Sequence, residues 1–483
     1  MTAPTATTAR RLVSQRVALV GADGALRVGP ACVDLEGARI AAVHDAPTSA
    51  PPPAEGAVVE DLGDRLLTPA FVDAHTHVAL TALRGLSVPE DADRNLVEDF
   101  FFRIETAMSA DDVRAFARMG AYEAILNGTA LVWDHYYRAN AMVAAFRDVG
   151  IAAVLAPTVQ DVAGPGIGQL EEALAATIAI GGDAALADAG VFAAFGPHAT
   201  DTVSPTLFLR IAGLAEQHAL PVHVHVAQSL DEVERVHERH GISPYELLAR
   251  SGLYDAAPRT LLIHNIFATS AELAALPRER VALGFCPHSK QIFAWMPDVG
   301  TWQGLGLPWF VATDCAASND ATNVQRDLRA AAGLRTAGLA TSAAHRAFVA
   351  EGGVERARAA WDERVRERAA TRWLGDTTAL LSRVWSVPGG LHPAFRAGVI
   401  EAGALANLCV WDVEHPAFWP GRDPLRALAM SDTTNALVNV MSAGRWLGEH
   451  GRYHASVVGS DAYREARVEA TRRLAEVEQR VRG

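Results

Sequence analysis

Short apolar runs alternate with helical segments through the middle of the chain. The runs have the length of buried strands, and the segments between them place apolar residues at helical spacing. One helix is expected over 111–127, with Ser109 as its N-cap and Gly128 at its end. Two more are expected over 207–218 and 231–240. The eight strands are expected at 71–77, 130–133, 150–157, 191–195, 221–226, 260–263, 281–285 and 309–312.

Repeated strand–helix units of this length predict a parallel sheet. Eight such units predict an α/β fold in which the strands close into a (β/α)8 TIM barrel. The catalytic groups of such a barrel lie at the carboxyl ends of its strands. The side chains that end the eight apolar runs are therefore the first candidates for chemistry.

A different pattern flanks these units. Residues 17–43 alternate apolar and polar positions around glycine-containing turns, which predicts short antiparallel strands. A proline-rich linker follows at 50–54. The second half of the chain adds β-like segments at 398–403, 407–412 and 435–446, and helical stretches at 335–373 and 460–483.

Length, charge and cysteine use narrow the class of protein. A chain of 483 residues is long enough for a barrel with an added domain. A net charge of -13 argues against nucleic acid or an anionic membrane as a partner. The four cysteines are scattered with no CxxC pair, which suits a reducing cytoplasm better than a disulfide framework. No secretory signal or apolar run of transmembrane length is recognised, so a cytoplasmic location is expected.

Two histidines end the first apolar run. If Phe71 to His77 forms a strand, His75 and His77 point to the same side and can bind one cation. The alternative is a pair of surface histidines without a metal. Similar residues recur at later strand ends, namely His223 and His225, then His264, then Asp314.

The segment Thr68–His77 resembles the first-strand signature of the amidohydrolase superfamily. The chain is most similar to the branch that deaminates purines, pterins and related N-heterocycles and dechlorinates triazines, over roughly residues 15 to 450. This resemblance implies that the terminal β segments join into one small β-sandwich beside the barrel. The implied domains are 12–66 and 385–455 for the sandwich, 67–384 for the barrel and 456–483 for a C-terminal helix.

The resemblance also implies a metal site. His225 matches the metal-binding histidine of a His-x-His-x-x-Glu motif, and Asp314 matches an aspartate that binds metal and carries a proton. His264 matches the histidine that contacts the water activated by the metal. One divalent ion, with zinc as the expected metal, would be bound by His75, His77, His225 and Asp314. A carbamylated lysine bridging two metals could only be Lys290, the sole lysine, so a single ion is expected.

The same resemblance indicates the substrate side of the site. Gln228 stands where the family has a proton-donating glutamate, and its amide can only form hydrogen bonds. His198 matches a histidine that touches substrate, and His135 ends the second strand and can line the pocket. Lys290 could neutralise an acidic substrate group or be a simple loop lysine, and Cys315 reads as a small buried residue.

The expected activity is metal-dependent hydrolysis of a C–N bond in a small molecule. Deamination of an N-heterocycle or amidine through an activated water is the main hypothesis. Hydrolysis of another C–N or C–Cl bond is the alternative, because Gln228 cannot protonate a ring nitrogen. A metal-binding but catalytically silent protein is a third hypothesis. A homodimer is an assembly that the sequence leaves open.

Overall fold

The computed structural model describes residues 9–45, 50–86, 97–292, 295–339, 342–370 and 376–482. All eight predicted apolar runs form strands, in the expected order along the chain. They are β6 (Phe71–Thr76), β7 (Thr129–Asp134), β8 (Ala152–Leu155), β10 (Val191–Ala193), β12 (Val222–Val226), β13 (Thr260–His264), β14 (Val281–Phe285) and β15 (Trp309–Val311).

These strands form two parallel sheets of four, ordered β10-β8-β7-β6 and β12-β13-β14-β15. Parallel backbone bridges link the edge strands of one sheet to those of the other. One bridge pairs Thr76 with Asp314, and another pairs Phe195 with Val222. Between the sheets lies a short parallel pair, β9 (Thr158–Val159) and β11 (Gly196–Pro197). The prediction of an α/β fold with parallel strands is confirmed.

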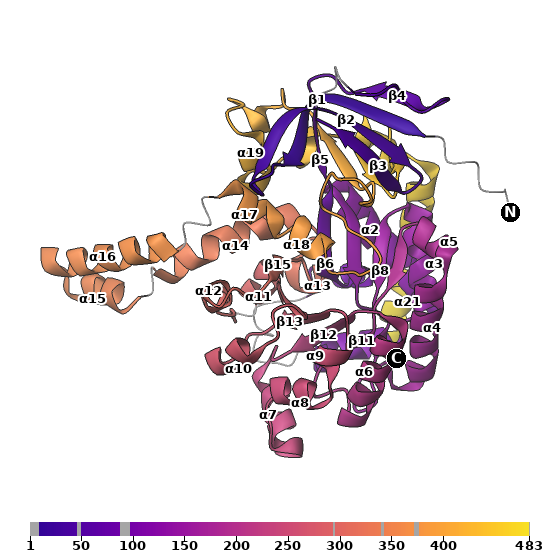
Figure 1. Ribbon diagram of the computed structural model, residues 1–483. Coiled ribbons are helices and arrows are strands. Elements are labelled where there is room, and N and C mark those ends of the chain that lie inside the picture. Colours follow the sequence, from indigo (N-terminus) through magenta and orange to yellow (C-terminus); the bar gives the residue numbers. More distant parts are fainter. Residues whose placement is uncertain are drawn as a thin grey trace.

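Helices cover the outer faces of these strands (Figure 1). The predicted helix at 111–127 is α2 (Ala110–Leu126), where Ser109 and Asp112 form a capping box and Gly128 follows with φ +85°. The other predicted helices are α6 (Pro205–His218) and α7 (Leu230–His240). The remaining helices between the strands are η2 (Val78–Leu83), η4 (Val97–Phe101), α1 (Phe102–Thr106), α3 (Ala139–Val149), η5 (Ile167–Gln169), α4 (Leu170–Gly182), α5 (Ala184–Asp188), α8 (Pro244–Arg250), α9 (Leu253–Ala256), α10 (Ser270–Ala275), α11 (Pro287–Ile292), α12 (Val299–Gly304) and α13 (Ala316–Asn319).

A separate eight-stranded sheet joins the two ends of the chain, at the top of Figure 1. Its central strand β5 (Leu66–Pro69) pairs with an N-terminal strand on one side and a C-terminal strand on the other. The predicted barrel boundary at residue 67 falls within β5. The other strands are β1 (Arg10–Val20), β2 (Leu26–Glu36), β3 (Arg39–His44), β4 (Val58–Asp61), β16 (Leu408–Trp411), β17 (Leu437–Ser442) and β18 (Arg445–Trp446).

The antiparallel strands predicted over 17–43 are found, but the first two are longer than expected, at 11 residues each, and β1 begins at Arg10. Arg11 would interrupt an apolar pattern, but its guanidinium donates to both carboxylate oxygens of Asp34 across the β1–β2 pair, at 2.5 and 2.7 Å. A paired charge can stay inside a strand that an apolar pattern alone would end. The sheet therefore extends beyond its apolar stretch.

The helical stretch predicted at 335–373 is divided between α14 (Val324–Leu339), α15 (Ala343–Glu351) and α16 (Val354–Ala370), and 371–373 lie outside the described residues. Figure 1 shows α15 and α16 extending away from the rest of the molecule.

The tail helix α21 (Asp461–Arg482) packs against α2, where Arg473 and Arg480 contact the buried Asp112. Residue 483, the last of the helical stretch predicted at 460–483, lies outside the described residues. The C-terminal half also contains α17 (Thr377–Ser382), α18 (Ser386–Gly389), η7 (Pro416–Phe418), α19 (Pro424–Met430), η8 (Thr434–Ala436) and α20 (Tyr453–Val458).

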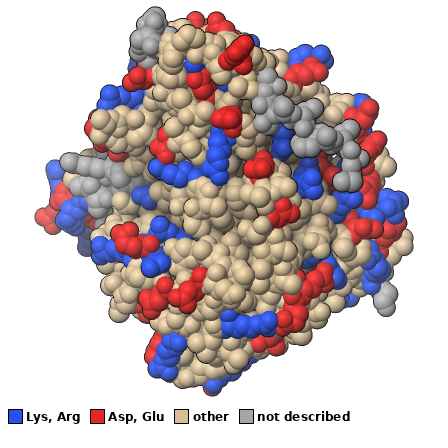
Figure 2. Space-filling view, turned by 45° about the vertical axis from the view of Figure 1, so that its right-hand side comes forward, with Lys and Arg blue, Asp and Glu red and all other residues tan. Residues whose placement is uncertain are grey.

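Charged side chains of both signs are interspersed on the face shown in Figure 2, around an uncharged central area. The described residues of this face therefore form no single acidic patch. Of the helices that the structure describes, none is both long and apolar enough to cross a membrane.

Candidate functional site

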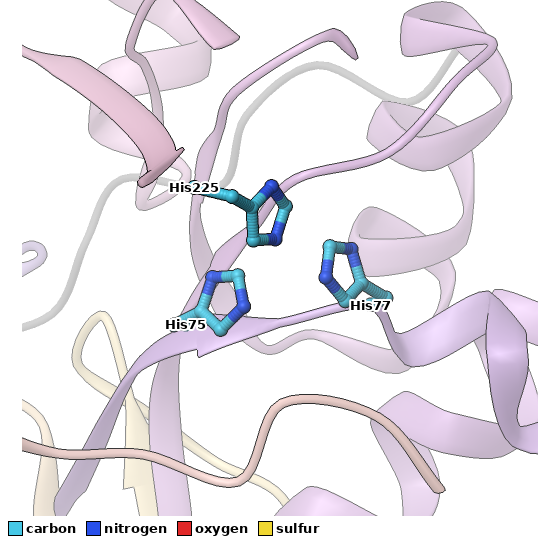
Figure 3. A group of neighbouring side chains, drawn as sticks. All are labelled: His75, His77 and His225. Atoms are coloured by element: carbon cyan, nitrogen blue, oxygen red, sulfur yellow. The ribbon is translucent and has the colours of Figure 1, made fainter. Parts of the chain in front are cut away.

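Four histidines and one aspartate meet at the carboxyl ends of β6, β12, β13 and β15. His75 lies within β6 and His77 directly follows it, while His225 lies near the end of β12. Figure 3 shows the imidazoles of these three residues turned toward one another. Their candidate ligand atoms lie within 4.8 Å of one another, and those of His75, His264 and Asp314 form a second group of the same size. Because His75 belongs to both groups, all five residues surround one small volume.

Hydrogen bonds determine which ring nitrogen each histidine presents. Nδ1 of His77 lies 2.5 Å from the carbonyl oxygen of His135, and Nδ1 of His225 lies 2.7 Å from that of His198. A carbonyl only accepts, so each Nδ1 carries the proton and each Nε2 keeps its lone pair. Nε2 of His75 is buried and has no hydrogen-bond partner among the described residues. A metal ion would satisfy this orphaned atom.

The two carboxylate oxygens of Asp314 face different groups. Oδ1 lies 3.6 Å from Nε2 of His75 and 3.5 Å from Nε2 of His77. Oδ2 accepts a hydrogen bond of 2.7 Å from the Ser289 hydroxyl and lies 3.4 Å from Nζ of Lys290. Nε2 of His264 lies 3.8 Å from the same oxygen. Oδ1 of Asp314 is thus directed at His75 and His77, and Oδ2 at Ser289, Lys290 and His264.

Burial and the neighbouring Lys290 charge determine the protonation states of the site residues. It lowers the pKa of His77 to about 4 and also lowers the pKa of His75, His225 and His264, so these rings are neutral near pH 7. Burial alone would raise the pKa of Asp314, but the Lys290 charge and the contact with His75 hold it well below its usual range. Neutral imidazoles and an ionised carboxylate are the protonation states that metal binding requires.

Backbone strain marks the same strand ends. His264 has φ +78° and Asp314 has φ +67°, in a region that residues other than glycine rarely adopt. The strained segment at Asp314 is held by its own N–H, which donates to the His75 carbonyl at 3.0 Å. Next to it, the Thr313 N–H donates to the Asp73 carboxylate at 3.0 Å. Such strain persists where surrounding contacts enforce it, and it clusters at functional sites.

A cavity opens above these groups and is lined by His77, His225, His264 and Asp314. Its apolar and aromatic lining comes mainly from η2, η4, α1 and the end of β7. Its polar lining comes from several strand ends and from α1, α11 and α13. The apolar and aromatic lining is formed by Leu80, Val97, Phe101, Phe102, Tyr136 and Tyr137, and the polar lining by Glu105, His135, Thr158, His198, Gln228, Lys290 and Ser318.

Comparison with known proteins assigns the chain to a family. The amidohydrolase family profile matches residues 66–351. A 5-methylthioadenosine/S-adenosylhomocysteine deaminase of Halobacterium salinarum is 31% identical over 409 residues, which cover 84% of this chain and 85% of the relative. The chain belongs to the amidohydrolase family. A deaminase of the same description from Natronomonas pharaonis is 27% identical over 95% of this chain and 96% of its own length.

A solved structure has the same fold as this amidohydrolase. It is an adenosine deaminase from Xanthomonas campestris with bound zinc, with a TM-score of 0.78 and 21% identity over 99% of this chain and 100% of that chain. The predicted family and branch are confirmed. The predicted reaction class, hydrolysis of a C–N bond other than a peptide bond, is confirmed by the deaminases among the relatives. The family uses a divalent metal, which fits the histidine and aspartate cluster.

The structure brings the predicted substrate residues of this amidohydrolase into the cavity wall. His135, His198 and Gln228 all line it. The Gln228 N–H donates to the buried Glu232 carboxylate at 2.8 Å, which fixes the turn that carries the amide. Trp133 is fully buried in the core against His392 and does not line the cavity.

Two site residues, Ser289 and Glu105, were missed by the sequence reasoning. The Ser289 hydroxyl donates a hydrogen bond to Asp314, whereas in the sequence only the neighbouring Lys290 was a candidate. Glu105 lines the cavity together with Tyr136, and burial raises the pKa of its carboxyl to about 7, against the opposing effect of the Tyr136 hydroxyl. No local signal could have found Glu105, because its helix is short and far in sequence from the metal motifs. Cys315 is buried and burial raises its thiol pKa to about 12, in agreement with the structural interpretation.

Proposed function

We propose that this amidohydrolase is a mononuclear zinc enzyme that removes an amino group from a small N-heterocycle. The observation that carries the proposal is the convergence of the Nε2 atoms of His75, His77 and His225 and the ionised Asp314 at the base of the cavity. The relatives named as deaminases of adenosine derivatives make adenine-type rings the first substrates to try.

His75, His77, His225 and Asp314 would hold the ion. The donor set of imidazole nitrogens and one carboxylate suits zinc, and Nε2 of His75, which has no hydrogen-bond partner in the part of the chain that the structure describes, gives the ion a buried atom to satisfy. When bound, the metal would supply a Lewis acid that lowers the pKa of a water molecule, so that the water can lose a proton and attack near neutral pH. Hydrogen bonds from each Nδ1 orient the imidazoles before the ion arrives.

Asp314 is the proposed general base. Its Oδ2 would take a proton from the attacking water and deliver it to the departing amine, so that a C–O bond forms, the C–N bond breaks and ammonia leaves. Nε2 of His264 lies 3.8 Å from this oxygen and would steady the charge that develops on the substrate. Gln228 would bind the ring by hydrogen bonds and transfer no proton, because an amide does not ionise near neutral pH. His135 and His198 would contact the remainder of the substrate.

The proposed fold around this site is a closed (β/α)8 barrel spanning 67–384. The bridges from Thr76 to Asp314 and from Phe195 to Val222 support closure, since they link both edges of the two parallel sheets. Residues 12–66 and 385–455 would form the small β-sandwich domain, and 456–483 the C-terminal helical segment. A cytoplasmic location and a homodimer stay predictions.

A second candidate is hydrolysis of a different C–N or C–Cl bond. Gln228 favours it, because a substrate with a better leaving group does not need a ring nitrogen to be protonated. Ammonia and chloride in the products separate the two candidates directly. A protein that binds zinc but turns over neither type of compound would correspond to the third hypothesis, a silent binding protein.

The test is an ammonia-release assay with the zinc-loaded protein on purines, their nucleosides, pterins, pyrimidines and amino- and chlorotriazines. We expect ammonia from at least one aminated ring, loss of that activity after chelation and recovery after zinc is returned. The His75→Ala, His77→Ala double variant should lose both metal and activity. The control is His237→Ala, His240→Ala, which removes two exposed histidines from α7. Activity that survives complete metal removal, or release of chloride alone, would contradict the proposal.

A further inference from the structure

The only lysine of the chain is placed in the cavity. Lys290 lies on the short helix α11, and just 6% of it is exposed to solvent. It lines the same cavity as Gln228, His264 and Asp314. The rest of the protein carries its positive charge on arginine, so a buried lysine at this one position is unusual in composition as well as in location.

The contacts of Lys290 place it on the cavity side of Asp314. Its Nζ lies 3.4 Å from Oδ2 of Asp314, the oxygen that already accepts a 2.7 Å hydrogen bond from Ser289. The Ser289 hydroxyl also lies 2.8 Å from the hydroxyl of Ser318, which lines the cavity. An ammonium group has three donors, so Lys290 can contact Asp314 and still bind a ligand oxygen. Ser318 offers a neighbouring hydroxyl to the same ligand.

Charge explains why a ligand oxygen with a negative charge suits this position. Among the described residues that line the cavity, Lys290 alone carries a lysine or arginine side chain. A divalent ion, the Asp314 carboxylate and Lys290 would together leave two positive charges, and the Glu105 carboxyl in the same cavity would remove at most one of them when ionised. Burying an ammonium is costly unless charge and hydrogen bonds compensate it. Asp314 compensates part of this cost, and an anionic substrate group would add a second negative partner, whereas a neutral heterocycle would not.

We infer that the substrate is an aminated N-heterocycle that carries an anionic oxygen group, such as a carboxylate, and that Lys290 binds this group. The inference rests on the proposed deaminase function and specifies its substrate class. Lys290 is a specificity-determining residue, and Ser318 lies where it can add a hydrogen bond. The charge of the substrate, in addition to its ring, then decides which compounds enter the cavity.

The test is a binding measurement by calorimetry on the zinc-loaded protein, with matched pairs of ligands. One pair is 4-aminopyrimidine-5-carboxylate and its carboxamide, and two further aminated rings provide equivalent pairs. The wild type should bind each carboxylate about 10-fold or more tightly than its carboxamide, as expected for a buried charge pair. Lys290→Met should abolish this ratio, and Lys290→Arg should retain most of it. Gln291→Met, at the exposed neighbouring position of α11, should leave the ratio unchanged.

Zinc content and the thermal midpoint of each variant serve as additional readouts. If Lys290 only supports Asp314, Lys290→Met will change zinc binding and weaken both members of a pair equally, which overturns the inference. Equal affinity of the wild type for both members of all three pairs, or no binding of any carboxylate, overturns it as well. Ammonia release is measured separately, so an active deaminase without carboxylate preference refutes the inference and leaves the proposed function standing. If Lys290→Met does not fold, Lys290→Gln replaces it in the same comparison.

Discussion

Nδ1 of His75 lies 2.8 Å from Nε2 of His223, and both rings are fully buried. The two residues are 148 positions apart in sequence, on β6 and β12. If His75 binds a metal through Nε2, its Nδ1 carries the proton and donates it to His223. His223 then fixes the orientation of a ligand without touching the ion.

We therefore expect His223→Leu to weaken zinc binding by about 10- to 100-fold, the usual effect of removing a group that orients a metal ligand. Competition with a chromogenic chelator measures the change. The control is His392→Leu, since His392 is buried but contacts the Ala193 carbonyl and belongs to the core. Equal zinc affinity in wild type and His223→Leu would show that the pair has no role in metal binding.

Asp314→Asn and His264→Asn should separate the two catalytic roles. Each should lower turnover by about 100-fold or more, as is typical of proton-transfer and charge-stabilising groups. Only Asp314→Asn should also weaken the metal, because Oδ1 of Asp314 faces the histidine ligands whereas His264 contacts Oδ2. Steady-state kinetics together with elemental analysis measure both effects. A fully active Asp314→Asn enzyme would refute the assignment of the base.

Gln228 should contribute to substrate binding alone. Gln228→Ala should cost about 1–3 kcal/mol in kcat/KM, because a substrate group is left unpaired, and metal content should not change. Gln228→Glu should impair the native reaction, since it removes the amide donors and adds a negative charge. If native turnover rose in this variant and its pH profile gained an acidic limb, the site would lack a proton donor and our interpretation of Gln228 would be wrong.

Glu105 should make stability depend on pH. Burial raises the pKa of this carboxyl from 4.5 to about 7 in the folded state. Between these values the unfolded chain loses the proton while the folded chain keeps it, so stability falls as pH rises from about 4.5 to 7. Glu105→Gln should remove this part of the pH dependence. Urea unfolding at pH 5 and pH 8 tests it: the variant should gain stability relative to wild type at the higher pH, and a pH-independent difference would contradict the assignment.

The strands and their order could be predicted because apolar runs and helix caps are local signals. The run at 281–285 is found as a strand with the same bounds, and Ser109 caps α2 as expected. The length of β1 could not be predicted, because the charge of Arg11 inside the strand is compensated by Asp34, 23 positions away, and by the Pro51 carbonyl. A pattern along the chain does not contain this compensation.

The same limit applies to the site. The histidines and Asp314 could be found because they stand at the ends of apolar runs, and the family resemblance supplied their roles. Ser289 and Glu105 could not, since the first acts through a hydrogen bond to a residue on another strand and the second through burial alone. For Lys290, composition singled out the residue, but only the structure separates a cavity lysine from a loop lysine.

The most direct test of the account is anomalous X-ray scattering at the zinc edge, measured on crystals of the zinc-loaded protein. We predict one peak per chain, within bonding distance of Nε2 of His75, His77 and His225 and of the Asp314 carboxylate, at about 2.0–2.2 Å. Two peaks at this position would contradict the mononuclear site. A single peak elsewhere, with these four side chains unligated, would contradict the assignment on which the proposed mechanism depends.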